Sequence, residues 1–221
     1  MIGSGKVVVI FLLALIVVGA ALFAPAGTLE YWQAWAYIGV LFIPVFFVVF
    51  YFLKNNPEFL ERRMMMKEKE AAQDLIVKVS AIIFIVAFLI PGFDQRFDWS
   101  DVPTEIVLIA DGFVFLGYVI VFLVFKENEY AGRTIQVEKN QKVISTGPYS
   151  IVRHPMYVGV LVMYLATPIA LGSYVAVPLF MLLIPIIILR ILNEEEVLRR
   201  DLSGYKEYCK KTKYRLLPFI W

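Results

Sequence analysis

Long apolar runs constrain the fold of this chain more than any other feature of its sequence. Short charged segments separate six of them, at residues 7–26, 32–53, 75–92, 102–125, 156–171 and 174–192. A helix needs roughly 20 predominantly apolar residues to cross the hydrocarbon core of a bilayer, and the first four runs are of that order. The sequence therefore predicts an all-α, polytopic integral membrane bundle of about five to six transmembrane helices, in which the last two runs form a hairpin around Gly172.

Composition supports a membrane protein. Hydrophobic residues make up 60% of the 221 residues and the mean hydropathy is +0.74, whereas soluble domains contain roughly 45–50% apolar residues. The runs are continuous, which disfavours a β-barrel, because barrel strands alternate apolar and polar residues. The first run is longer than the apolar core of a usual signal peptide, and we interpret it as a retained span.

Two residue types exclude whole classes of site. Cys209 is the single cysteine and His154 the single histidine, so the chain lacks the ligands for a cysteine-based metal cluster or a structural zinc site. We expect Cys209 to be an incidental thiol and expect no metal. The net charge of +2 is divided between basic and acidic segments, and we expect no nucleic-acid partner.

Basic residues indicate the orientation in the membrane. Every Lys and Arg except Arg96 lies before the first run or in the segments 54–78, 126–153 and 190–221. The positive-inside rule places both termini and these segments in the cytoplasm. We expect two parts: residues 1–125, with the N-terminal transmembrane helices and the cytoplasmic loop 54–78, and a C-terminal core at 126–221.

Charged and aromatic groups gather where the predicted hairpin begins and ends. The segment 147–157, GPYSIVRHPMY, places Arg153 and His154 at its start, and Arg190 and the run 194–196, EEE, follow its second span. Antiparallel spans bring these ends together at one membrane face, which is costly unless the groups pair or bind a ligand. Residues 194–213 carry apolar and tyrosine side chains at helical spacings and predict an amphipathic helix that covers this cluster.

These residue types suit a cationic, zwitterionic ligand. Arg190 lies one helical turn before Glu194, so both side chains share a face. A guanidinium binds a carboxylate or phosphate, a carboxylate binds an ammonium group, and tyrosine rings hold cations such as a sulfonium. Each charged group of S-adenosylmethionine would have a binding partner in this cluster, which therefore indicates a site for this cofactor.

The same residues carry a family resemblance. The pattern GPYxxxRHPxYxG, a hydrophobic hairpin, RxxxEExxL and a GYxEY segment resembles the isoprenylcysteine carboxyl methyltransferases of the bacterial type. Phospholipid N-methyltransferases share the RHPxY and EE elements, and sterol reductases have a related C-terminal region. The matching residues are Gly147, Pro148, Tyr149, Arg153, His154, Pro155, Tyr157, Gly159, Arg190, Glu194, Glu195, Leu198, Gly204, Tyr205 and Tyr208.

The resemblance implies a buried S-adenosylmethionine site in the C-terminal half, with S-adenosylhomocysteine as product, and a lipophilic or prenylated acceptor that enters sideways from the membrane lipids. It assigns the acceptor carboxylate to Arg190 and a catalytic role to Arg190 and Glu194. The residues that it implies for the cofactor are Gln136, Gln141, Lys142, Val143, Ile144, Tyr149, Arg153, His154, Pro155, Met156, Tyr157, Glu194 and Glu195.

The acceptor is left open between two chemistries. A carboxylate, as in an isoprenylcysteine-like substrate, is ionised at neutral pH and needs only orientation and exclusion of water. An amine, as in a phospholipid N-methyltransferase, must lose a proton, and Glu194 or Glu195 would be the base. Arg190 favours the carboxylate. A third hypothesis is a non-catalytic membrane protein that binds a lipid through the hairpin.

Three residues of the fourth run allow a structural or a functional interpretation. An acidic residue inside a span is a functional candidate, but Asp111 lies toward the predicted outer end, and we expect it to reach water. Gly112 and Gly117 favour close helix packing over catalysis.

Overall fold

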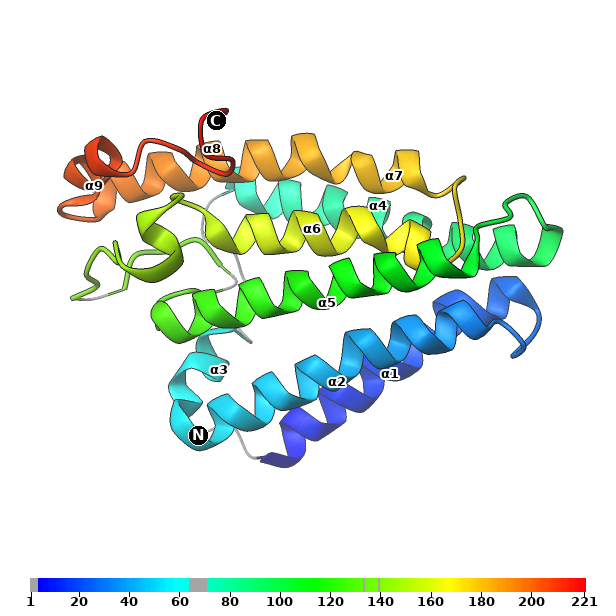
Figure 1. Ribbon diagram of the computed structural model, residues 1–221. Helices are drawn as coiled ribbons and strands as arrows, with labels where there is room; N and C mark the ends of the chain where they lie inside the picture. The colour runs from blue at the N-terminus through cyan, green and yellow to red at the C-terminus, as the bar shows by residue number, and fades with distance from the viewer. Residues whose placement is uncertain (1–3, 64–70, 133, 139) are drawn as a thin grey trace.

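The computed structural model describes residues 4–63, 71–132, 134–138 and 140–221. Within these residues the regular structure is helical (Figure 1). The elements are α1 (Ser4–Ala26), α2 (Trp32–Asn55), α3 (Pro57–Arg63), α4 (Ala71–Phe97), α5 (Thr104–Glu127), η1 (Gly147–Ser150), α6 (Pro155–Ala170), α7 (Val177–Met181), α8 (Leu183–Asp201) and α9 (Tyr205–Lys211). The predicted all-α class is confirmed.

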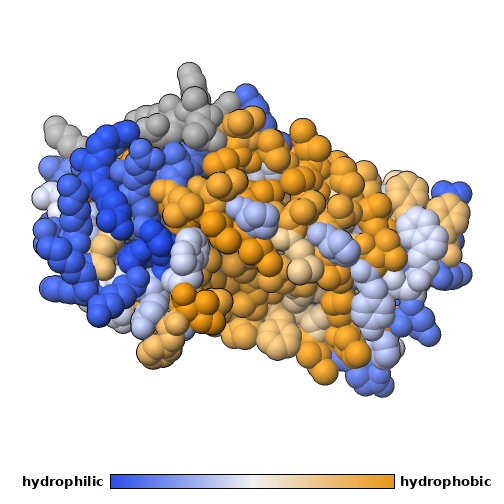
Figure 2. All heavy atoms as spheres, turned by 90° about the horizontal axis from the view of Figure 1, so that it is seen from above, coloured by the Kyte–Doolittle hydropathy of each residue, from blue (hydrophilic) through white to orange (hydrophobic). Residues whose placement is uncertain are grey.

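The long helices run side by side, and their lengths and compositions are those of membrane-spanning helices. Among the described residues, 5 stretches are long and apolar enough to span a bilayer: Val8–Ala26, Trp32–Asn55, Leu75–Phe97, Thr104–Glu127 and Val177–Asp201. Figure 2 shows a broad hydrophobic band between hydrophilic ends. The chain is a multi-pass integral membrane protein.

The predicted hairpin is present, with a short first arm and a broken second arm. The fifth run forms α6, which has 16 residues, and the sixth forms α7 and α8, which meet at Leu182. Gly172 has a φ of +71° at the turn, a conformation that favours glycine. Close by, Asp94 of α4 accepts hydrogen bonds from Ser100 and from the hydroxyl of Ser173, which fastens this end of the hairpin to α4.

Gly117 and Gly159 let α5 and α6 approach at backbone distance. A Cβ added at Gly117 would lie 2.6 Å from the carbonyl oxygen of Gly159, and one at Gly159 would lie 2.8 Å from that of Gly117. Gly112 has no such neighbour within 4 Å among the described residues. Of the two glycines expected to pack helices, only Gly117 does so, and its contact sets the position of α6.

Asp111 does not reach water as expected. It is 6% exposed, and its Oδ1 has no hydrogen-bond partner among the described residues. The expectation was wrong because α5 turns this side chain toward the bundle, on the same side as Val107, Val114 and Gly117.

The predicted amphipathic segment 194–213 is divided in two. The helix α8 continues to Asp201, and α9 begins at Tyr205 after a turn in which Gly204 has a φ of +83°. The left-handed residue redirects the chain, so that α9 folds back at the end of the bundle that also carries η1 and α3 (Figure 1).

Candidate functional site

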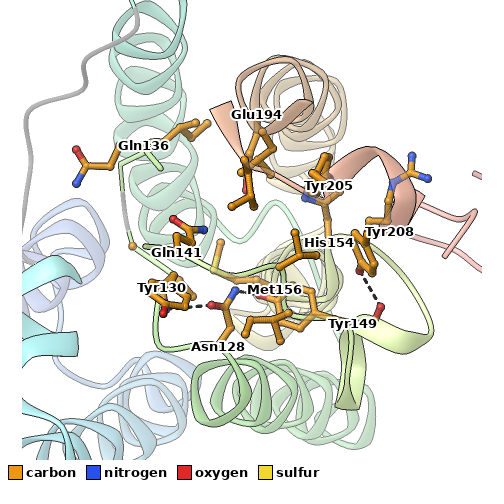
Figure 3. Close-up of a pocket in the computed structure, with 18 of the residues that line it drawn as sticks. Asn128, Tyr130, Gln136, Gln141, Tyr149, His154, Met156, Glu194, Tyr205 and Tyr208 are labelled. Carbon is orange, nitrogen blue, oxygen red and sulfur yellow. Dashed lines mark hydrogen bonds between the residues drawn. The ribbon is translucent and has the colours of Figure 1, made fainter. Parts of the chain in front are cut away.

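A cavity lies at this end of the bundle, where the C-terminal end of α5, the loop after it, η1, the start of α6, α8 and α9 meet (Figure 3). The loop contributes residues 128, 130–132, 134–136 and 141–144 to its lining. Gly147 begins η1 with a φ of +55°, and a Cβ there would lie 2.9 Å from the Glu127 carboxyl carbon. Glycine therefore allows the chain to turn sharply beside the end of α5 and present Tyr149 to the cavity.

Most of the residues predicted for the site line this cavity. They are Gln136, Gln141, Lys142, Val143, Ile144, Tyr149, Arg153, His154, Met156, Tyr157, Arg190 and Glu194. Among the described residues, Pro155 and Glu195 are not part of the lining. Pro155 instead begins α6, where its ring fits the first helical position.

A single phenol connects the two ends of the hairpin. The Tyr157 hydroxyl accepts a hydrogen bond from Arg190 Nε at 2.9 Å and donates one to Glu194 Oε2 at 2.8 Å. Tyr157 lies in the first turn of α6 and the other two residues lie one turn apart on α8. The hairpin thus brings Arg190 and Glu194 beside the RHPxY motif, as the run lengths predict.

Helix α4 holds this turn of α8 in place. Gln73 is fully buried and donates a hydrogen bond from Nε2 to Asn193 Oδ1 at 2.6 Å. The same nitrogen lies 3.4 Å from the carbonyl oxygen of Arg190. These contacts hold α8 in place at Arg190 and Asn193.

Glu195 is enclosed by three arginines and His154. Its Oε1 lies 2.7 Å from Arg153 Nε and 3.4 Å from His154 Nε2, and its Oε2 lies 3.2 Å from both Arg199 and Arg215. Only 2% of Glu195 is exposed. A buried carboxylate is tolerated only when such partners satisfy it, so these contacts stabilise the fold at this position.

The C-terminal tail closes over the motif. The backbone NH groups of Arg153 and His154 donate to the carbonyl oxygens of Tyr214 and Arg215, both at 2.9 Å. The Arg153 guanidinium also donates to the carbonyl of Lys213 at 2.8 Å. The tail therefore sets the backbone path that leads into α6.

Tyrosine side chains form another wall. Asn128 Nδ2 donates to the Tyr149 hydroxyl at 2.8 Å, and the Tyr208 hydroxyl donates to the Tyr149 carbonyl at 2.7 Å. The Tyr205 hydroxyl is buried and has no hydrogen-bond partner among the described residues. Burial raises the pKa of Tyr149, Tyr205 and Tyr208 well above its ordinary value, so each phenol stays protonated at neutral pH and can donate a hydrogen bond.

Asn128, Tyr130, Tyr205 and Tyr208 also line the cavity, although the sequence patterns did not predict them as site residues. The GYxEY pattern was a usable signal for the last two, which were expected only on a covering helix. Asn128 and Tyr130 follow the fourth span directly, where their sequence carries no sign that they turn inward.

The family model described as phospholipid methyltransferase matches residues 106–203. This stretch runs from α5 through α8 and includes the hairpin and most of the cavity lining. The predicted resemblance to membrane methyltransferases is confirmed. The matched region begins inside α5 and therefore crosses the predicted boundary at residue 125. The division into two parts stays a prediction.

A solved structure has a fold similar to that of this chain. The eukaryotic intramembrane Ras methyltransferase ICMT (isoprenylcysteine carboxyl methyltransferase) superposes with a TM-score of 0.56 over 92% of this chain and 74% of that chain, at 19% sequence identity. At this identity the likeness establishes the fold.

A curated relative matches over a shorter region. The Delta(14)-sterol reductase TM7SF2 of Mus musculus is 30% identical over 91 residues, which are 40% of this chain and 22% of the reductase. The match spans about a fifth of the reductase.

Proposed function

We propose that this protein is an S-adenosylmethionine-dependent methyltransferase that acts on a lipophilic acceptor within the membrane. The observation that carries the proposal is the contact of Arg190 and Glu194 with one phenol, Tyr157, in the wall of a cavity formed largely by the phospholipid methyltransferase region. An anion binder and a cation binder are thereby held side by side.

The donor set fits the proposed cofactor. The Glu194 carboxylate would bind its ammonium group, and the Tyr149 and Tyr208 rings would face its positive charge. The Tyr205 hydroxyl, which has no hydrogen-bond partner within the described part of the chain, would donate to one of the cofactor's polar oxygens. When bound, the cofactor supplies an electrophilic methyl group, which an acceptor oxygen attacks as sulfur leaves with the bonding electron pair, giving a methyl ester and S-adenosylhomocysteine.

The acceptor that we favour is the carboxylate of an isoprenylcysteine-like molecule. Arg190 would hold this carboxylate, and the Tyr157 hydroxyl would fix the orientation of the guanidinium. A carboxylate is already ionised, so these residues need only orient it and exclude water. The cofactor site would face the cytoplasm, which is where the positive-inside rule places this end of the bundle.

Binding of S-adenosylhomocysteine tests the cofactor. Titration calorimetry on the purified protein in detergent should show saturable binding, and Glu194→Gln should weaken it about 10- to 100-fold, because a charge-assisted contact is lost. Glu196→Gln is the matched control, since Glu196 is exposed one residue beyond the buried Glu195. The proposal fails if the wild-type protein shows no binding.

A phospholipid N-methyltransferase is the second candidate, favoured by the family model that matches. An amine acceptor must lose a proton, for which Glu194 would be the base. Membranes incubated with cofactor labelled in its methyl group separate the two: a base-labile ester indicates the carboxylate acceptor, and base-stable label in a phospholipid indicates the amine. Saturable binding without transfer to either acceptor would indicate a non-catalytic protein.

A further inference from the structure

A second hollow lies on the outside of the bundle between α2 and α5. It is lined by α2 residues from Pro44 to Asn55 and α5 residues from Phe115 to Phe122, and its volume is about 540 Å³, within the range of roughly 300–1,000 Å³ of small-molecule sites. Phe47 and Phe115 on its two sides are 65% and 53% exposed. Since both helices have the composition of membrane spans, the hollow opens toward lipid.

The length of the hollow fits one leaflet. Pro44 and Lys54 are ten residues apart on α2, a rise of about 15 Å at roughly 1.5 Å per residue. The hydrocarbon core of a bilayer is roughly 30 Å thick. An acyl chain from one leaflet would therefore lie along the hollow from its polar end to the middle of the membrane.

Cations mark the polar end. Lys54 lines the hollow in the last turn of α2. On α5, Lys126 Nζ lies 5.9 Å from the centroid of the Phe122 ring, and this ring lines the hollow and packs edge-on against Tyr51. The two lysines thus lie at the same end of neighbouring helices, the end that carries α3 (Figure 1), where lipid phosphates lie.

An aromatic cluster separates this hollow from the candidate active site. Phe52, Phe59, Val124 and Phe125 are buried together, and Phe122 of the hollow and Tyr149 and Met156 of the cavity pack against them. No described residue lines both the hollow and the cavity. A molecule in the hollow would therefore be distinct from the cofactor.

We propose that the hollow binds one anionic phospholipid of the leaflet at this end of the bundle. One acyl chain lies between α2 and α5, against Phe47, Phe115 and Val119, and the phosphate lies between Lys54 and Lys126. Burial of the chain provides affinity, and the two ammonium groups select for net negative charge over a zwitterionic headgroup.

The test compares phosphatidylglycerol with phosphatidylcholine of the same acyl chains, each added at the same mole fraction to the purified protein in a neutral detergent. Native mass spectrometry measures the bound lipid, and thermal unfolding measures Tm. We expect about tenfold tighter retention of phosphatidylglycerol, and a rise in Tm of about 3–6 °C at tenfold excess over its Kd.

Two sets of variants locate the site. Lys54→Gln combined with Lys126→Gln should abolish the preference, and Val119→Trp, which fills the hollow, should reduce retention of both lipids. Lys206→Gln combined with Lys210→Gln removes two exposed lysines of α9 and should leave the preference intact. S-adenosylhomocysteine binding should be unchanged in every variant, which keeps this test independent of the proposed function.

The proposal is overturned if the wild-type protein retains both lipids equally. It is also overturned if the Lys54→Gln and Lys126→Gln variant keeps the preference for phosphatidylglycerol, or if the Lys206→Gln and Lys210→Gln variant loses that preference to the same extent. It is also overturned if a prenylcysteine analogue displaces phosphatidylglycerol one for one, because the hollow would then hold the acceptor.

Discussion

Tyr205 lines the cavity and is only 4% exposed, and its buried hydroxyl has no hydrogen-bond partner among the described residues. A buried hydroxyl without a partner costs about 1–3 kcal/mol, and a bound ligand would remove this cost. Tyr205→Phe should therefore weaken S-adenosylhomocysteine binding about 5- to 20-fold in calorimetry and leave Tm unchanged or slightly higher.

Tyr208→Phe is the comparison for Tyr205→Phe. It deletes the hydroxyl that donates to the Tyr149 carbonyl at 2.7 Å and should lower Tm, because this partly buried carbonyl loses the closer of its two donors and keeps only the Thr212 hydroxyl at 3.3 Å. Equal binding by wild type and Tyr205→Phe would show that the ligand does not use this hydroxyl.

Glu195 and Glu196 are neighbours in sequence with opposite environments. Glu195→Gln should destabilise the protein by about 3–5 kcal/mol, since the buried Arg153 guanidinium loses its counter-ion. Glu196→Gln should change the stability by less than about 0.5 kcal/mol, as usual for an exposed position. Thermal unfolding in detergent measures both, and similar Tm values for the two variants would contradict the structural role of the ion cluster.

At the scale of the elements, the contact of α5 with α6 positions the RHPxY motif. Gly117→Ala should cost about 1–3 kcal/mol, because its Cβ would meet the backbone of α6 and push the helices apart. Since α6 begins at Pro155, directly after His154, the same change should also weaken S-adenosylhomocysteine binding.

Gly112→Ala on the same helix is the control for Gly117→Ala. Its Cβ would meet no described atom within 4 Å, and alanine favours the helix by up to about 1 kcal/mol relative to glycine. We expect equal or higher Tm and unchanged binding. A loss of stability at Gly112 equal to that at Gly117 would argue against close packing as the cause.

For the whole molecule, orientation is the property to test. The positive-inside rule places α9 in the cytoplasm, and α9 carries Cys209, a free and partly exposed thiol. A membrane-impermeant maleimide should label Cys209 in inside-out vesicles and not in intact cells. Glu30→Cys in a Cys209→Ser background, between α1 and α2, should give the opposite pattern, and labelling of Cys209 from outside would reverse the proposed orientation.

The sequence by itself determined the membrane class, the helical architecture, the start of the hairpin and its turn at Gly172. These follow from the lengths of apolar runs and from helical periodicity, which are local properties. The same local rules brought Arg190 and Glu194 beside the RHPxY motif, because antiparallel spans of similar length must return to the same face.

Only the tertiary structure decided which neighbouring side chains point into the cavity. Consecutive residues of a helix point about 100° apart, so Glu194 and Glu195 cannot both face it, and sequence spacing does not say which one does. Packing of α8 against Gln73 and the pairing of Glu195 with Arg153 and Arg215 determine the rotation of α8. The inward position of Asp111 and the burial of the Tyr205 hydroxyl likewise depend on contacts between segments far apart in sequence, which local patterns do not encode.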